Sequence, residues 1–426
     1  MKSVVSIVKG KDVEAMVDEA LDLIGGIESV VKPGNVVLIK PNVHGAHPLE
    51  DHITTDPRLV AAVVKKCKKA GAKEVLVGEA PSLGADTMFC FEIAGMKDAV
   101  EAAGARLVDL ETDEFAPMEI PQGKILKSID RPKTFINCDV LISMPVMKTH
   151  HGTKVTGSLK NMMGTLNRAG KDLVHQVGLD EAIADINKAR KPDLVVADMI
   201  VAMEGEGPIA GRTVTIQPDG SRWIRETVGG ILVPMDLIVA SRDPVANDAT
   251  CCRIMKVNPE EVFHLQFAYE HGLGNIGVAQ IEVRGKQIEE VSRAFSLPPT
   301  TFEEFAEYVT VHSENACFAC PAYLYMALLN LRERDLLERN SGLHIVMGEK
   351  KHIPDDWGMG RNLLLLGNCV SKWKHLGLYA EGCPPMWAFS LGVVMRDLSP
   401  EARAEMRNIQ LAHPTENEKK WNLKGA

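Results

Sequence analysis

Short runs of consecutive apolar residues alternate along most of the chain with amphipathic segments of helical period. Such runs, bounded by turn residues, are typical of buried parallel strands, and their alternation with helices predicts βαβ units. The predicted strands cover residues 36–39, 75–77, 106–110, 140–144, 194–198 and 236–240, and the predicted helices cover residues 57–70, 92–104 and 179–190, with another starting at Pro244. The pattern therefore predicts an α/β domain over residues 1–295, with a largely parallel sheet and flanking helices.

A proline-containing segment, residues 296–300, separates this domain from the rest of the chain. Thr301 and Glu304 have the spacing of a capping box, which predicts that a new helix starts there. Apolar runs at residues 344–347 and 363–366 predict two further strands. We therefore expect a smaller α/β module over residues 296–426.

Charge and composition exclude some classes of function. Lys plus Arg number 48 and Asp plus Glu number 57, which gives a net charge of −9. This balance argues against a nucleic-acid protein that binds through its overall charge, and the aromatic content of 5% argues against a base-stacking platform. No run approaches the ~20 apolar residues of a membrane span, and the charged N-terminal segment does not fit a signal peptide. The sequence predicts a cytoplasmic protein, whose cysteines are then thiols or metal ligands rather than disulfides.

Four of the nine cysteines gather late in the chain, at Cys317, Cys320, Cys369 and Cys383. The first two form a C-x-x-C pair, and the other two follow glycine-containing turns. Cys320 precedes a helical stretch, and Cys383 precedes a predicted helix at residues 387–394. Helix N-termini favour the thiolate form that binds metals. The other cysteines lie among apolar residues or inside predicted helices, where we expect them to pack in the core: Cys67, Cys90, Cys138, Cys251 and Cys252.

Four thiols at turns predict one metal site made by Cys317, Cys320, Cys369 and Cys383. A [4Fe–4S] cluster and zinc both accept four thiolates. Structural zinc more often uses two C-x-x-C knuckles, whereas proline after a ligand cysteine, as at Cys383, is found in iron–sulfur proteins. The pattern favours the cluster and leaves zinc as the alternative. A redox-active dithiol at Cys317 and Cys320 is a third option.

Polar residues follow the predicted strands of the large domain at the ends where ligands of open α/β sheets bind. We expect these residues to lie on loops that line one pocket for a small anion near the cysteine module. Lysine is a point charge suited to carboxylate or phosphate, and His150, Glu204 and Lys148 are the candidate catalytic residues. The candidate substrate-binding residues are Lys40, Asn42, Lys148, Lys160, Asn161, Asp198, Gly205 and Gly207. The sequence contains no Walker A motif and no dinucleotide-binding glycine pattern after the first strand.

Several of these segments together resemble the family called domain of unknown function 362. The matching segments are Lys40-Pro41-Asn42, Thr55-Asp56-Pro57, Lys148-Thr149-His150, Leu159-Lys160-Asn161 with Gly164, Glu204 to Pro208, and Asp243 to Ala246. The resemblance covers about residues 35–290. It implies an association with iron–sulfur cysteines, which many members carry in a ferredoxin-like insert, whereas this chain has four dispersed cysteines. The strand, polar loop and helix start are more distantly similar to the lactate racemase nickel-pincer family, without a counterpart of its cofactor motif.

These observations predict an iron–sulfur oxidoreductase that acts on a small anionic organic substrate and receives electrons from a donor protein. A lyase or isomerase that uses the cluster or zinc as a Lewis acid is the first alternative. A non-catalytic electron-transfer or metal-binding protein is the second. We expect no nucleic-acid or membrane partner, and the oligomeric state stays open, with a homodimer as one option.

Overall fold

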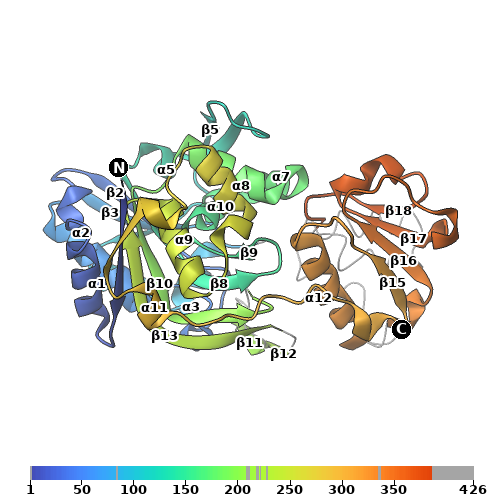
Figure 1. The fold of residues 1–426 in the computed structure, drawn as a ribbon. Coiled ribbons are helices and arrows are strands. Elements are labelled where there is room, and N and C mark those ends of the chain that lie inside the picture. The colour runs from blue at the N-terminus through green and yellow to red at the C-terminus, as the bar shows by residue number, and fades with distance from the viewer. Residues whose placement is uncertain are drawn as a thin grey trace. The chain divides into compact units, whose positions relative to one another are not determined.

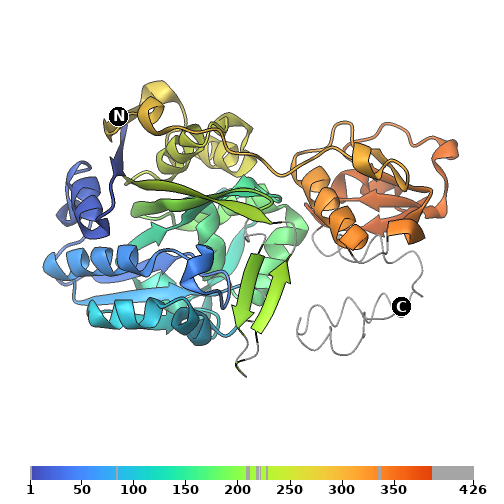
Figure 2. The same cartoon turned by 90° about the horizontal axis from the view of Figure 1, so that it is seen from below.

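The computed structural model describes residues 2–82, 85–207, 212–216, 220, 222–226, 229–333 and 337–385. The chain divides into two compact units. The large unit comprises Met1–Val174 and Leu179–Pro298, and the small unit comprises His175–Gly178 and Pro299–Ala426. Figures 1 and 2 show the large unit as a sheet between helices and the small unit as a second, smaller sheet with its own helix.

A ten-stranded mixed sheet forms the centre of the large unit. Its strands lie in the order β14-β1-β13-β10-β7-β2-β3-β4, and β8 pairs with β10 and with β9. The strands are β1 (Ser3–Lys9), β2 (Val36–Pro41), β3 (Glu74–Glu79), β4 (Arg106–Asp109), β7 (Val140–Met144), β8 (Val146–His150), β9 (Lys154–Val155), β10 (Leu194–Gly205), β13 (Gly230–Ser241) and β14 (Ile281–Gly285). Most pairs are parallel, including β2 with β7, while β13 runs antiparallel to β1 and β10. The predicted α/β fold with a largely parallel sheet is confirmed.

Alternation along the strands gives the sheet two buried faces. Val37 and Ile39 belong to one apolar cluster and Leu38 belongs to the other. The first face packs against α1 (Val13–Asp22), α2 (Pro57–Lys69), α3 (Thr87–Ile93) and α4 (Met96–Ala102). The second packs against α6 (Ser158–Asn161), α8 (Leu179–Ala189), α9 (Pro244–Ile254) and α10 (Phe263–Glu270). Burial on both faces explains why these strands read as continuous apolar runs.

The remaining elements of the large unit are short. Two hairpins are formed by β5 (Phe115–Glu119) with β6 (Ser128–Pro132) and by β11 (Arg212–Ile216) with β12 (Arg222–Glu226). The other helices are α5 (Lys133–Asn137), α11 (Ile288–Val291) and α7 (Arg168–Val177), whose last residues are counted with the small unit.

The small unit contains a four-stranded sheet in which every neighbouring pair is parallel. Its strands, in spatial order, are β15 (Val309–His312), β16 (Leu343–Met347), β17 (Gly360–Leu366) and β18 (Gly377–Ala380). The helix α12 (Ala319–Glu333) follows β15 and packs its apolar residues, Leu324 and Leu328 among them, on the sheet. The predicted smaller α/β module is thus confirmed as a parallel sheet of its own.

Two helix predictions are wrong. The segment 92–104 is not one helix, because Gly95 adopts a left-handed conformation with φ +68° and separates α3 from α4. The segment after Thr301 forms a single 3₁₀ turn, Glu303–Phe305, whose N-cap has no side-chain hydrogen bond, so the capping box does not form. The helix predicted at residues 387–394 lies outside the described residues.

Helices long and apolar enough to cross a membrane are absent from the described part of the chain.

Candidate functional site

Three neighbouring parallel strands, β2, β7 and β10, bring most of the predicted site residues to one edge of the large sheet. Lys40 lies near the carboxyl end of β2. After β7, Pro145 interrupts the strand and β8 continues in the same direction, pairing Lys148 with Met203 of β10. Lys148 therefore lies on a strand and Lys160 on helix α6, which corrects the prediction that loops carry them.

Lys40 forms a fully buried ion pair with Glu79. The two side chains are 1% and 3% exposed, and Lys40 Nζ lies 2.7 Å from Glu79 Oε1. Lys40 Nζ also donates to the carbonyl oxygen of Pro41 (2.6 Å) and to Oδ1 of Asn161 (3.3 Å). These three acceptors match the three N–H donors of an ammonium group. The predicted substrate ligand Lys40 is thus already engaged by protein groups.

Gly164 completes the surroundings of this ion pair. A Cβ atom at Gly164 would lie 2.1 Å from Glu79 Oε1 and 2.7 Å from Lys40 Nζ. The second oxygen of Glu79 accepts the backbone N–H of Val43 at 2.7 Å. The pair therefore fixes the start of the loop after β2 against the turn that follows α6.

Lys148 is 1% exposed and reaches that same loop. Its Nζ donates to the carbonyl oxygen of Ile53 at 2.5 Å, and Asn42 Nδ2 donates to the same oxygen at 3.1 Å. Burial and, after it, the charge of Lys160 lower the pKa of Lys148 to about 7, whereas the charge of Asp198 opposes this shift. Asp198 accepts the backbone N–H groups of Asp56 and Ile200, and burial raises its pKa to about 6.

Lys160 contacts His150 through nitrogen atoms. Lys160 Nζ lies 3.0 Å from His150 Nε2, and the backbone N–H of Gly152 donates to His150 Nδ1 at 2.8 Å. A neutral imidazole has one donor and one acceptor nitrogen, so its proton is on Nε2. His150 Nε2 is then the donor and Lys160 Nζ the acceptor, which requires a neutral amine. Burial lowers the pKa of Lys160 to about 8, and the charge of Asp180 opposes this shift, so the neutral amine is more accessible than in an ordinary lysine.

Asp248 positions the short helix that carries Lys160 and Asn161. Its buried carboxylate accepts the backbone N–H groups of Ser158 (2.8 Å) and Leu159 (3.0 Å), which are the first residues of α6. Asn161 in turn donates to the Lys40 carbonyl oxygen at 2.9 Å and to Ser143 Oγ at 3.1 Å. The residues Lys40, Asn42, Lys148, His150, Lys160, Asn161 and Asp198 thus belong to one connected polar cluster, which we call the lysine cluster.

Glu204 does not join this cluster. One of its oxygens pairs with Arg293 at 2.8 Å and the other accepts the backbone N–H of Ser296 at 3.1 Å. These contacts tie the end of β10 to the segment that leaves the large unit's last helix. The proton-transfer role predicted for Glu204 stays a prediction, although both of its oxygens are held by structural partners.

Gly205 and Gly207 form a tight turn against β8. Thr149 Oγ1 donates to the Gly205 carbonyl oxygen at 2.8 Å, and His151 Nδ1 lies 2.9 Å from the Gly207 carbonyl oxygen. A Cβ atom at Gly207 would lie 2.3 Å from the Thr149 carbonyl oxygen, so only glycine fits there. Gly205 is required by its left-handed φ of +79° and Gly207 by this close packing, and their predicted contact with a ligand stays untested.

Glu206, between these glycines, is a candidate functional residue that the sequence-based list omitted. It is 6% exposed, and neither carboxylate oxygen has a hydrogen-bond partner among the residues that the structure describes. Burial raises its pKa to about 7. A buried carboxyl group that gains no hydrogen bond is costly to the fold, which points to a role in binding or proton transfer. The repeated Glu-Gly pattern was visible in the sequence, but the sequence did not show that both acids are buried and that Glu204 has partners for both of its oxygens.

The loss of stability that a buried, unpaired Glu206 carboxylate causes can be measured. A carboxyl group whose folded pKa is raised contributes stability below its unfolded pKa, and this contribution is lost as the pH rises through the folded pKa. We expect the free energy of unfolding of Glu206→Gln to exceed that of the wild type by about 1–3 kcal/mol at pH 8, and to equal it near pH 4.5. Urea denaturation at both pH values measures this, and equal stability at pH 8 would contradict an uncompensated carboxylate.

All four late cysteines lie at the carboxyl edge of the small sheet. Cys369 and Cys383 each follow the last residue of a strand by three positions (369 − 366 and 383 − 380), and Cys317 follows β15. Cys320 is the second residue of α12, whose positive N-terminal end favours a thiolate. The predicted place of Cys320 at a helix N-terminus is confirmed. The five remaining cysteines are buried, as predicted.

Hydrogen bonds join the two loops that carry Cys369 and Cys383. Gly367 N–H donates to the Ala380 carbonyl oxygen at 2.9 Å, and Gly382 N–H donates to Asn368 Oδ1 at 2.9 Å. The pKa of Cys320 is raised well above its usual range, first by a hydrogen bond with the Cys317 thiol and then by burial and by the charges of Cys383 and Cys369. These contributions indicate that the four thiols lie in one region of the small unit. Among the described residues, however, no group of three or more His, Cys, Asp or Glu side chains is arranged to hold a single metal ion.

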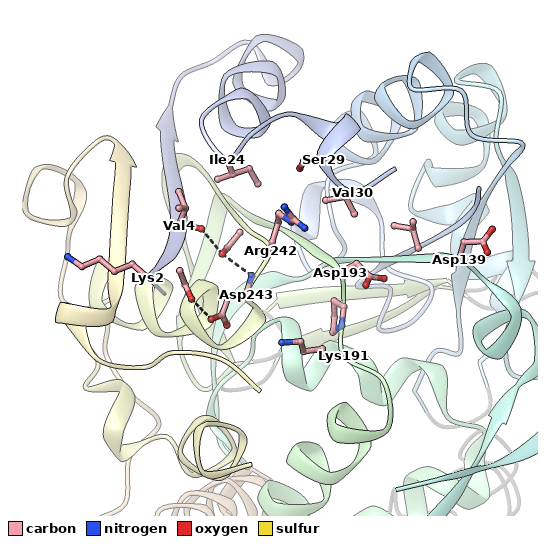
Figure 3. A pocket seen from close by; sticks show the side chains of 14 residues that line it. Lys2, Val4, Ile24, Ser29, Val30, Asp139, Lys191, Asp193, Arg242 and Asp243 are labelled. Atoms are coloured by element: carbon pink, nitrogen blue, oxygen red, sulfur yellow. Dashed lines mark hydrogen bonds between the residues drawn. The ribbon is translucent and has the colours of Figure 1, made fainter. Parts of the chain in front are cut away.

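A cavity of about 570 Å³ lies at the opposite edge of the large sheet (Figure 3). Asp139 and Asp193 line it and accept the backbone N–H groups of Val36 and Leu141, at the amino ends of β2 and β7. Arg242, Ile24 and Val30 face the same space in Figure 3. None of the predicted site residues lines this cavity, so it is separate from the lysine cluster.

The fold and the lysine cluster define an α/β protein with a buried polar site at the carboxyl edge of its sheet. The chain belongs to the family described as domain of unknown function (DUF362), whose model matches residues 37–253. The matched segment contains the whole lysine cluster. The resemblance predicted from the sequence motifs is thereby confirmed.

One relative is the thylakoid-associated protein sll1697 of Synechocystis sp., which is 31% identical over 198 residues. The match covers 45% of this chain and 60% of that protein, so the chain spans less than two thirds of the relative's length. The relative's name places it at the thylakoid, and the cytoplasmic location expected for this chain stays a prediction.

Two solved structures are similar over most of their length. The lactate racemase apoprotein from Thermoanaerobacterium thermosaccharolyticum is 11% identical, with a TM-score of 0.36, and the match covers 92% of this chain and 91% of that one. A protein from Thermotoga maritima is 13% identical, with a TM-score of 0.31, and the match covers 87% and 100%. At these scores the likenesses carry no argument about function.

Proposed function

We propose that the protein is an iron–sulfur oxidoreductase that acts on a small anionic organic substrate. The observation that carries this proposal is the burial of Lys148, which is 1% exposed, in one cluster with the partly buried Lys160 and with His150, in a chain whose net charge is −9. Burying a lysine ammonium is unfavourable unless an anion compensates for its charge. A carboxylate bound at this edge of the sheet would supply that compensation.

Each residue of the lysine cluster then has a distinct task. Lys148 supplies the positive charge that faces the carboxylate, and Asn42 holds the Ile53 carbonyl that orients the Lys148 ammonium. His150 and Lys160 share a proton between two nitrogens 3.0 Å apart, which suits proton transfer to or from a substrate. Lys40 and Asn161 keep α6 and β2 in register and act as positioning residues.

The four cysteines of the small unit suit a [4Fe–4S] cluster. Two of the four thiols, Cys369 and Cys383, lie on loops that are hydrogen-bonded to each other, and Cys320 lies in the first turn of α12, at its positive end. Zinc would require four sulfurs each about 2.3 Å from one point, whereas a cluster takes ligands that lie farther apart. When bound, the cluster would supply electrons one at a time.

The exposure of the cysteine-bearing edge supports an external electron donor. Cys369 is exposed and Cys317 and Cys383 are partly exposed, so a donor protein could approach this edge. A donor protein, rather than a nucleotide, is also favoured by the lack of a phosphate-binding glycine motif in the sequence.

Oxidation of the reduced protein by candidate substrates tests this function. The protein, purified without oxygen and reduced with dithionite, is freed of excess reductant and mixed with small carboxylic acids. We expect one class of reducible acid to restore the absorption of the oxidised cluster with saturating dependence on the acid. The variant Lys148→Met should lose this response, while Lys188→Met, outside the cluster, should keep it. Failure of every reducible acid, with the iron present, would contradict the oxidoreductase.

A further inference from the structure

Lys160 has the features of a lysine nucleophile. Its amine accepts a hydrogen bond from His150 Nε2–H, because His150 Nδ1 already accepts the Gly152 N–H. A neutral amine is the form that attacks carbonyl carbons, and lysines are activated for this by a desolvated site and a neighbouring cation. The charges of Lys148 and Lys160 interact, so protonation of one disfavours protonation of the other. The Lys160 residue as a whole is partly buried.

Lys148 and Lys160 differ in their other contacts, and these contacts favour different protonation states. Lys148 donates to the Ile53 carbonyl oxygen and is influenced by the nearby Asp198 carboxylate, which favours its charged form. Lys160 Nζ contacts the uncharged imidazole of His150, and the charge of Asp180 raises the pKa of Lys160 by less than burial lowers it. When two ammonium groups lie close together, the second proton binds poorly, so one nitrogen stays neutral. The hydrogen-bond pattern identifies that nitrogen as Lys160 Nζ.

We propose that Lys160 forms an imine with the carbonyl group of a 2-oxo acid whose carboxylate is bound by Lys148. This inference rests on the proposed anion-binding function and names its substrate class. Two adjacent lysines, one charged and one neutral, match the two adjacent groups of a 2-oxo acid, an anionic carboxylate and an electrophilic carbonyl.

The covalent step balances with the groups present. The Lys160 nitrogen forms a bond to the carbonyl carbon, and one of its protons is lost to the carbinolamine oxygen. That proton passes through solvent, while His150 Nε2–H lies next to the nitrogen and holds it in place. The second N–H proton passes in the same way to the hydroxyl oxygen, the carbon–oxygen bond breaks, water leaves, and a neutral C=N bond remains, which a proton from solvent converts to the protonated imine. The protonated imine attracts electrons more strongly than the free ketone, which suits reduction of that carbon.

Reductive trapping tests the imine. The full-length protein is incubated with pyruvate and cyanoborohydride, and the intact mass and the modified peptide are determined by mass spectrometry. We expect one adduct per chain, located on Lys160. Lactate, which has the carboxylate but no carbonyl, should protect the site without forming an adduct. Lys160→Arg keeps a cation but cannot form an imine, so it should lose at least nine tenths of the adduct.

Lys188 provides a matched control. It also contacts a histidine, with its Nζ 3.2 Å from His271 Nδ1, but it lies outside the lysine cluster. Lys188→Arg should trap pyruvate as the wild type does. Binding of pyruvate is measured in parallel by calorimetry, and circular dichroism checks that each variant is folded, with Lys160→Met as a second variant.

The possible failures are distinguishable. If pyruvate and lactate bind but no adduct forms, or if the adduct lies on another lysine, the imine is wrong and the anion site stands. If no 2-oxo acid or hydroxy acid binds at all, both the imine and the proposed function are wrong.

Discussion

Replacing Lys40 with methionine is expected to lower the free energy of unfolding by about 3–5 kcal/mol. The Lys40–Glu79 pair is buried on all sides, with a 2.7 Å contact between Nζ and Oε1. The variant would leave Glu79 as a buried carboxyl group without a cation. Its pKa, already raised by burial, would rise further because Lys40 opposes that shift. Thermal or urea denaturation near pH 7 measures the loss.

The double variant Lys40→Met/Glu79→Leu provides the control for this effect. Replacing both charges with apolar groups removes the unpaired carboxyl group, so most of the lost stability should return. Gly164→Ala should also destabilise the protein strongly, since its Cβ would overlap Glu79 Oε1. A loss below about 1 kcal/mol for the single variant would mean that the pair is not closed in solution.

Replacing Lys148 with methionine is expected to abolish carboxylate binding and yet stabilise the unliganded protein. Loss of a charge that faces a bound carboxylate in a buried site weakens binding by about 2–5 kcal/mol, or roughly 30-fold to several thousand-fold. Calorimetric titration with the acid that reoxidises the reduced protein measures this. Unchanged affinity would place the anion site elsewhere.

The stability gain follows from the sign of the Lys148 shift. Its pKa is lowered from 10.5 to about 7, so the unfolded chain binds the additional proton between these two pH values. Wild-type stability therefore rises with pH across this window. At pH 7 the methionine variant should be more stable by roughly 2–4 kcal/mol, and the difference should vanish near pH 10. A variant that is less stable at pH 7 would show that Lys148 is structural.

The sequence predicted the strands of the large sheet well because burial on both faces makes them continuous apolar runs. The runs at residues 36–39 and 140–144 correspond to β2 and β7, and their parallel pairing is confirmed. The prediction of one helix over residues 92–104 is wrong because the helical period of the sequence continues across Gly95, which adopts a left-handed conformation. The segment at Thr301 failed because a capping box is only a local signal, and there the chain passes from one 3₁₀ turn into strand β15.

The sequence predicted where the candidate site lies, but it did not predict the hydrogen-bond and ion-pair partners of the site residues. Polar residues at strand ends placed Lys40 and Lys148 at one edge of the sheet. The partner of Lys40, Glu79, ends a different strand, and nothing in the local sequence links the two. Asp248 is separated from α6 by an even longer stretch of chain, although it positions that helix. Such long-range pairs arise from tertiary packing, which a single sequence does not show.

The cysteines illustrate the same division. Turn residues around Cys369 and Cys383 predicted that they would lie in loops. That all four cysteines lie at the carboxyl edge of one sheet follows from the parallel order of β15 to β18, which the sequence alone did not establish.

Iron and sulfide analysis of protein purified without oxygen, with its absorption spectrum, tests the central claim most directly. We expect about four iron atoms and four sulfides per chain, with the broad absorption near 400 nm typical of thiolate-bound iron–sulfur clusters. Cys320→Ala should lose nearly all of this iron, whereas Cys67→Ala, which alters a buried core thiol, should keep it. Protein that contains one zinc and no iron, or that keeps its iron in Cys320→Ala, would contradict the account.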